Sequence, residues 1–220
     1  MPEFEFSSRL LGEVGVLLLA VSLHESAHAF MANWLGDRTG KELGRVTLNP
    51  LPHLHPLLSV LLPAYLILSK SHYLFAAGRP VPVSVDQLKK PGRDFALVAL
   101  AGPATNVLLA LLLSGAWIFL AGGDDPILSH RAEGFYWVRF GIKINVLLAC
   151  FNLIPIPPLD GSRLLAFFLP GPLRRAFYAL DALGFLLILA LVITGVMNTI
   201  VLHTYQPVFD WWYDLCLSWL

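Results

Sequence analysis

The sequence predicts an all-α polytopic membrane protein with four to five transmembrane helices, a short membrane-associated β-hairpin and one proline-broken helix. Two observations lead to this fold class. Of the 220 residues, 56% are hydrophobic and 14% are charged, whereas soluble domains are about half apolar and a quarter charged. Four stretches also reach the length of about 20 mostly apolar residues that a spanning helix needs. The formal net charge is zero, without a long basic run, which argues against a nucleic-acid partner.

Taken in order, the elements form a single domain over residues 1–220. The spans are expected over residues 10–35, 95–121, 135–156 and 177–202. The first run lacks a basic leader, which favours a retained helix over a signal peptide. A further run over 51–68 contains three prolines, and the sequence leaves open whether it re-enters or spans. The tail over 207–220 carries three tryptophans and a tyrosine, as an interfacial helix would.

Basic residues suggest an orientation, because Lys and Arg collect in cytoplasmic loops. If the run over 51–68 re-enters, most of the Lys and Arg residues share one side of the membrane. We therefore expect the N-terminus outside and the basic loops in the cytoplasm.

The β-hairpin is expected within residues 41–50. The stretch Arg45-Val46-Thr47-Leu48 alternates polar and apolar residues between Gly44 and Asn49-Pro50, which is typical of a short strand bounded by turns. Strand backbone is tolerated at membrane depth only where protein or water satisfies it. The sequence thus places a hairpin at the edge of a polar cavity.

A metal-binding motif lies in the first apolar run, His24-Glu25-Ser26-Ala27-His28. Four residues of separation place both imidazoles on one face of a helix, and Glu25 is then positioned to activate water beside a zinc ion. The alternative is that the two histidines satisfy each other in a core. An acidic residue at the centre of a span costs at least about 2.5 kcal/mol, which favours the metal site.

A catalytic zinc site usually has three protein ligands, and Asp160 is the best candidate for the third. It follows Pro155, Pro157 and Pro158 and precedes Gly161. Prolines preclude a regular helix, and glycine permits an unusual backbone angle. The alternative role for Asp160 is a helix cap for residues 162–169.

Together these motifs resemble the site-2 proteases, intramembrane zinc metallopeptidases, in their short form without PDZ or CBS domains. The resemblance covers nearly the whole chain and rests on four segments: His24-Glu25-Ser26-Ala27-His28, Gly44-Arg45-Val46-Thr47-Leu48-Asn49-Pro50, Ala101-Gly102-Pro103-Ala104-Thr105-Asn106, and Asn152 through Asp160-Gly161.

The resemblance implies one Zn(2+) per chain, held by His24, His28 and Asp160, with Glu25 as general base. It also implies that Asn152 holds the substrate backbone near the metal, although Asn152 could instead only cap broken backbone. Asn106 lies in an apolar helix, and its side chain is expected to form a hydrogen bond to a neighbouring helix.

One departure from the family pattern concerns His53-Leu54-His55-Pro56, where related short members commonly have His-x-Asp-Pro. His55 stands where a carboxylate is expected. Whether His53 and His55 bind a second metal is left open, because isolated loop histidines are usually solvated or satisfied in a core.

The expected activity is endopeptidase hydrolysis within the bilayer, at a prokaryotic plasma membrane, with the active site opening toward the cytoplasm. The resemblance implies single-span membrane proteins or signal-peptide remnants as substrates, and homo-oligomer formation is left open. The alternative is a non-catalytic zinc-binding membrane scaffold or carrier. Such a protein needs ligands but no general base, so Glu25 argues against it.

Overall fold

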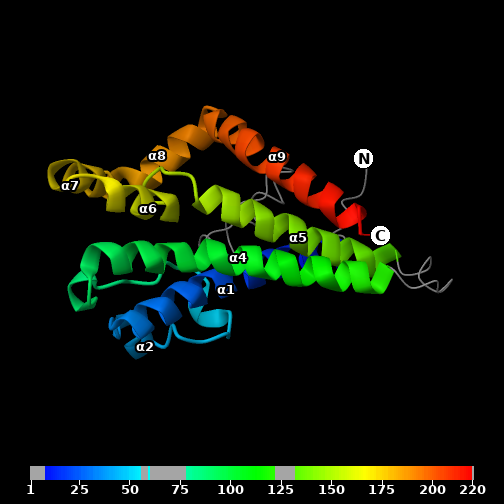
Figure 1. The fold of residues 1–220 in the computed structure, drawn as a ribbon, viewed down its shortest axis with the longest axis horizontal. Helices are drawn as coiled ribbons and strands as arrows, with labels where there is room; N and C mark the ends of the chain where they lie inside the picture. Colours follow the sequence, from blue (N-terminus) through cyan, green and yellow to red (C-terminus); the bar gives the residue numbers. More distant parts are fainter. Residues whose placement is uncertain (1–7, 56–58, 60–77, 122–131, 220) are drawn as a thin grey trace, which may run out of the picture.

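The computed structural model describes residues 8–55, 59, 78–121 and 132–219, and these residues are mostly helical (Figure 1). The elements in chain order are α1 Ser8–Leu35, α2 Thr39–Glu42, the 3-10 helices η1 Leu51–His53 and η3 Val85–Gln87, α4 Pro91–Ala121, α5 Ala132–Asn152, α6 Asp160–Phe168, α7 Gly171–Ala179, α8 Asp181–Ile193 and α9 Val196–Leu217.

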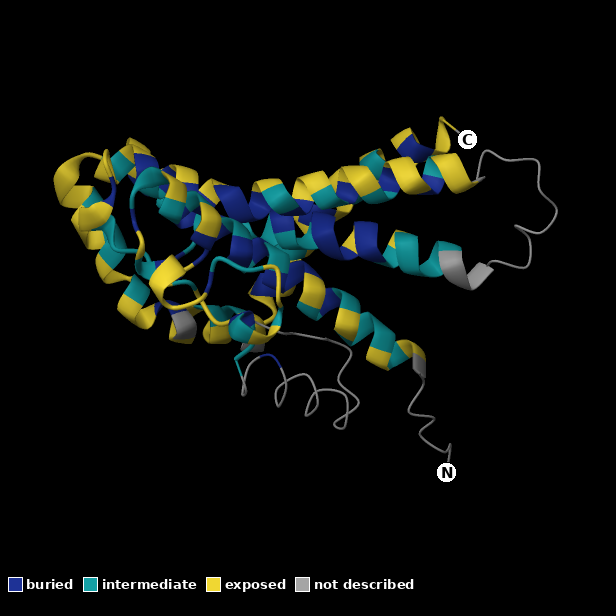
Figure 2. Ribbon diagram, turned by 90° about the horizontal axis from the view of Figure 1, so that it is seen from below, coloured by how far each residue is buried: buried dark blue, intermediate teal, exposed yellow. Residues whose placement is uncertain are grey.

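Helix α4 lies at the centre of the molecule, with α1 and α5 packed along it (Figure 1). Helix α9 runs along α5, and the short helix α6 packs on α4. Buried residues follow the facing sides of these helices (Figure 2). The main apolar cluster joins α4, α5 and α9, and its buried members are Ala110, Trp117, Ile142, Val146, Tyr205 and Cys216.

Two helices in the described part of the chain, Arg9–Leu35 and Pro91–Leu120, are long and apolar enough to cross a membrane. A third candidate joins Gly171–Gly184 to Leu186–Val192 across a 67° bend. The prediction of four to five spans is therefore wrong for the described residues. Helix α5 carries Arg139 and Lys143, and the run over 177–202 is divided among α7, α8 and α9. Most of the run over 51–68 lies outside the described residues.

The predicted β-hairpin is also wrong. Residues 43–50 form turns and bends, and the described residues contain no strand, only an isolated bridge between Leu54 and Gly78. The polar groups of this loop are instead satisfied by its own neighbours and by α1. The buried Arg45 guanidinium donates to the Pro52 carbonyl, and the Thr47 carbonyl accepts from Ser26 Oγ at 2.6 Å. The alternation in sequence reflects docking on a helix, since no strand among the residues that the structure describes pairs with this loop.

The proline-rich stretch separates α5 from α6 and brings Asp160 to the first position of α6. Its Pro157–Pro158 peptide bond is cis. The tail over 207–220 continues α9, with Pro207 inside the helix, and its place at the membrane interface stays a prediction. Trp212 Nε1 donates to Ser114 Oγ at 2.9 Å, which fastens this part of α9 to α4.

Candidate metal centre

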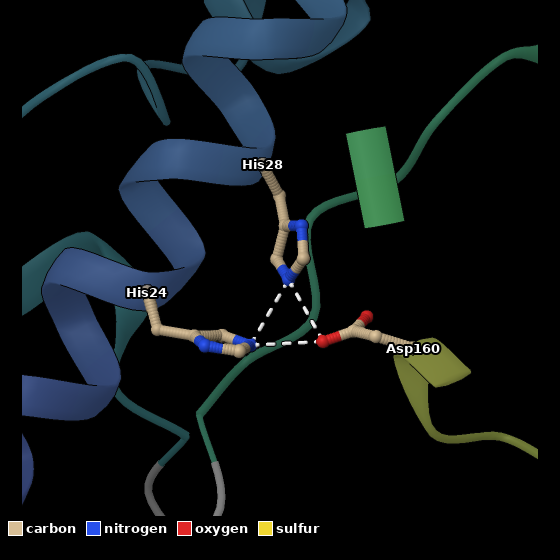
Figure 3. A group of neighbouring side chains, drawn as sticks. All are labelled: His24, His28 and Asp160. Atoms are coloured by element: carbon tan, nitrogen blue, oxygen red, sulfur yellow. Dashed lines mark hydrogen bonds and ion pairs between the residues drawn. The ribbon is translucent and has the colours of Figure 1, made fainter. Parts of the chain in front are cut away.

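Three side chains from two distant parts of the sequence converge on one point (Figure 3). His24 and His28 project from α1, and their Nε2 atoms are 3.0 Å apart. Asp160 approaches from α6, and its Oδ2 atom lies 3.1 Å from His24 Nε2 and 3.3 Å from His28 Nε2. All of the ligand atoms that this cluster offers lie within 4.8 Å of one another. The structure therefore brings together the three residues that the sequence predicted as ligands.

Each imidazole is held from its far side by helix α4. His24 Nδ1 lies 2.6 Å from Asn106 Oδ1, and His28 Nδ1 lies 2.7 Å from the Val98 carbonyl oxygen. A carbonyl oxygen can only accept, so His28 Nδ1 carries the proton and His28 Nε2 presents a lone pair. This is how metal-binding histidines are usually oriented. Both rings are buried, at 5% and 8% exposure.

The cluster fits a metal ion. Asp160 Oδ2 is buried without a hydrogen-bond donor, and a buried carboxylate oxygen without a partner is costly. A cation between the three atoms would satisfy the carboxylate and both lone pairs. Two imidazole nitrogens and one carboxylate oxygen are a ligand set that zinc accepts. A proton on His28 Nε2 could also face Asp160, so protons and metal compete for the same position.

Because residue 102 is a glycine, no side chain fills the space beside these ligands. A Cβ atom at Gly102 would stand 2.5 Å from both His24 Cε1 and His28 Nε2. Any side chain here would press on the imidazoles. The sequence showed Gly102 only as part of the resemblance, and this contact could not be read from spacing.

Asp160 is placed by a close backbone contact. A Cβ atom at Gly161 would stand 2.1 Å from the Leu153 carbonyl oxygen, so only glycine lets α6 begin this close to the end of α5. Gly161 is therefore needed for close approach, and not for the unusual backbone angle that the sequence suggested. The preceding Pro158 packs on Gly184 of α8, where a Cβ atom would meet the proline ring at 2.7 Å.

Glu25 is half-buried on α1 and is held by residues 78–90. The Val81 amide donates to Glu25 Oε2 at 3.2 Å. Buried Asp37 fixes the same segment, because its Oδ2 atom accepts from the Ser84 amide at 2.8 Å. The segment over 78–84 therefore holds the Glu25 carboxylate through the Val81 amide.

His53 connects the loop that follows α2 to helix α1. It is fully buried, and its Nε2 atom lies 3.0 Å from Ser26 Oγ and 3.1 Å from the Thr47 carbonyl oxygen. Burial lowers the pKa of His53, and the bond to Thr47 opposes this only in part. In the portion described by the structure, His24, His28 and Asp160 make up the group that could hold a metal, and His53 lies outside it.

Asn152 ends helix α5, where its side-chain amide donates to the Leu148 carbonyl at 3.0 Å. Its role in holding substrate remains a prediction. Asn106 forms the expected helix-to-helix hydrogen bond, since its Nδ2 atom donates to Asn145 Oδ1 on α5 at 2.9 Å. Sequence reasoning missed its second contact, to His24. The one sequence feature that could have indicated this contact was an asparagine in an otherwise apolar helix.

A buried His-His-Asp cluster with a glutamate beside it defines the class of protein as a metalloprotein with a hydrolase-like centre. Comparison with known proteins narrows this class. The "Putative zinc metalloprotease YwhC" of Bacillus subtilis is 34% identical over 81% of this chain and 78% of its own length. Rip2 of Mycolicibacterium smegmatis, which bears the same description, is 35% identical over 86% of this chain and 72% of its own length.

MJ0611 of Methanocaldococcus jannaschii, again with this description, is 36% identical over 41% of each chain. The chain belongs to this family of zinc metalloproteases. No family model matches the chain, and no solved structure matches it.

Proposed function

We propose that the chain is an intramembrane zinc endopeptidase of the site-2 protease type, which hydrolyses peptide bonds within or near transmembrane segments of membrane-anchored substrates. One observation carries this proposal. His24 and His28 lie on a helix long enough to cross a membrane and meet Asp160 with their lone pairs facing one point. Glu25 lies between the two histidines on the same helix. Ligands and a base at membrane depth are expected of an enzyme that cuts there.

The residues have distinct roles in this reaction. A zinc ion held by His24, His28 and Asp160 would polarise the scissile carbonyl and lower the pKa of a bound water. Glu25 takes the proton of the attacking water and returns it to the leaving amine. Because a carboxylate has two oxygens, Oε2 can stay with the Val81 amide while the other accepts the proton. Asn152 orients the substrate backbone near this point.

The position of the site favours membrane-anchored substrates, either single-span proteins or signal-peptide remnants. The ligands lie on a candidate span, so the scissile bond must reach membrane depth. A helical substrate must unwind there, since helical carbonyls are engaged in the helix's own hydrogen bonds. Basic residues gather between α1 and the first turn of α4, which supports an opening toward the cytoplasm; these are Arg38, Lys41, Arg45, Arg79, Lys89, Lys90 and Arg93.

The test is zinc content and cleavage of a single-span substrate, measured in detergent for the wild type, Glu25→Gln and Asp160→Ala. Glu25→Gln is expected to keep its zinc and to lose about 10²- to 10⁴-fold in cleavage rate, the usual effect of removing a general base. Asp160→Ala is expected to weaken zinc binding. Glu13→Gln is the matched control, because Glu13 lies on the same helix but contacts Tyr136.

Unchanged cleavage by Glu25→Gln would refute the assigned mechanism. Near-stoichiometric zinc in a wild type that cleaves no substrate would instead support the scaffold or carrier. Glu13→Gln should match the wild type in both measurements, which controls for loss of an acidic residue from α1.

A further inference from the structure

A chain of buried amides connects His24 to a backbone carbonyl on another helix. His24 Nδ1 meets Asn106 Oδ1 at 2.6 Å, and Asn106 Nδ2 meets Asn145 Oδ1 at 2.9 Å. Asn145 Nδ2 in turn meets the Gly141 carbonyl oxygen at 2.9 Å. Asn106 is fully buried and Asn145 is 4% exposed. Polar side chains this deep are costly unless every group is paired.

The direction of every bond in this chain follows from its last member. The Gly141 carbonyl can only accept, so the NH₂ group of Asn145 faces it and the Asn145 oxygen faces Asn106. Asn106 must then donate to Asn145 and present its own oxygen to His24. His24 Nδ1 therefore carries the proton, and His24 Nε2 is left with a lone pair toward Asp160.

The tautomer of His28, the second histidine, does not depend on another side chain. His28 Nδ1 bonds directly to the Val98 carbonyl of α4, whose polarity cannot reverse. An asparagine amide, in contrast, can turn over and present either a donor or an acceptor. The tautomer of His24 is thus the one that needs a further residue to set it.

We propose that Asn145 is a positioning residue for the metal: it sets the tautomer of His24 through Asn106, although it contacts none of the three ligands. This inference rests on the proposed zinc function and deepens it. Without Asn145, the Asn106 amide can reverse and turn its NH₂ group toward His24. The proton of His24 then moves to Nε2, where it occupies the position that the metal needs.

The experiment measures zinc affinity in detergent by competition with a chromophoric chelator. Asn145→Leu and Asn106→Leu are each expected to bind zinc about 10- to 100-fold more weakly than the wild type, the usual effect of losing an orienting partner. Asn145→Asp should stay close to the wild type, because a carboxyl group still accepts from Asn106 and, when protonated, donates to Gly141.

The double variant of Asn106→Leu and Asn145→Leu separates this role from a structural one. If Asn145 acts through Asn106, the double variant binds zinc no more weakly than Asn106→Leu alone. Ser114→Ala is the matched control, because it removes a different buried interhelical bond, to Trp212, and should leave zinc affinity unchanged. Thermal unfolding of the metal-free proteins monitors folding in parallel.

Three results would overturn the inference: wild-type affinity in Asn145→Leu, losses that multiply in the double variant, or a loss in Asn145→Asp as large as that in Asn145→Leu. A wild type that binds no zinc would instead refute the proposed function itself. The two failures are therefore distinguishable.

Discussion

The metal ligands are positioned in two different ways. His24 and His28 lie on one uninterrupted helix, where a separation of four residues alone places them on the same face. Asp160 begins a short helix after a proline-rich break, and no periodicity relates it to α1. Its place depends on the backbone contact between Gly161 and Leu153. The positions of the two histidines thus follow from local helix geometry, whereas the position of Asp160 follows from packing. Glycine substitutions near the two kinds of ligand should therefore have unequal effects.

The largest effect is expected from Gly161→Ala. The new Cβ atom would stand 2.1 Å from the Leu153 carbonyl oxygen, a backbone atom that no rotamer change can move. Overpacking of this kind costs about 3 kcal/mol or more. We expect this loss in the free energy of unfolding, together with loss of zinc as Asp160 moves. Denaturant unfolding and zinc content measure the two effects.

Gly171→Ala is the control for this substitution, because a Cβ atom there meets open space. Wild-type stability and zinc content in Gly161→Ala would show that this contact does not position Asp160.

A smaller effect on folding is expected from Gly102→Ala. Its Cβ atom would stand 2.5 Å from His24 Cε1 and His28 Nε2, which are side-chain atoms that can shift. We expect a loss of about 1 kcal/mol in the free energy of unfolding, with zinc bound at least about 10-fold more weakly because ligand geometry is disturbed. Chelator competition measures the affinity. Gly115→Ala, on the same helix in open space, should bind zinc normally, and equal affinities for both variants would contradict the prediction.

The smallest effect is a pH dependence from His53, which fastens the loop to α1. Burial lowers the pKa of His53 from its usual 6.5, so below pH 6.5 the unfolded chain binds more protons than the folded one. Stability therefore rises with pH across this window and is lost as the pH falls from 6.5 toward the lowered pKa. Unfolding measured between pH 7.5 and about pH 5 should show a shallower decline for His53→Gln than for the wild type. Parallel declines would show that His53 contributes nothing to this dependence.

The sequence predicted well those features that depend on local spacing. Helices α1 and α4 follow from apolar runs, and the shared face of His24 and His28 follows from helical periodicity. The break before Asp160 follows from its prolines. The hairpin expected within residues 41–50 failed because alternation looks the same whether a segment pairs with a strand or docks on a helix. The span count failed because α5 carries Arg139 and Lys143, and because the run over 177–202 is divided among α7, α8 and α9, the last break lying at Gly195, where φ is 74°.

The sequence could not predict features that depend on which helices are neighbours. Asn106 and Asn145 each appear as isolated polar residues, and nothing in their spacing relates them to each other or to His24. The same holds for Gly102, whose role depends on the close approach of α4 to α1. Periodicity assigns a residue to a face of its helix, but the partner on that face comes from the tertiary arrangement.

The separation of the ligands along the chain also bears on when the enzyme can become active. His24 and His28 are made early in synthesis, whereas Asp160 and the helix that it begins follow only after α5 is complete. A growing chain can thus place its first helices while its cluster still lacks the carboxylate. Tight metal loading is then a late event in biogenesis, and a truncated product that ends before α6 would lack the complete site.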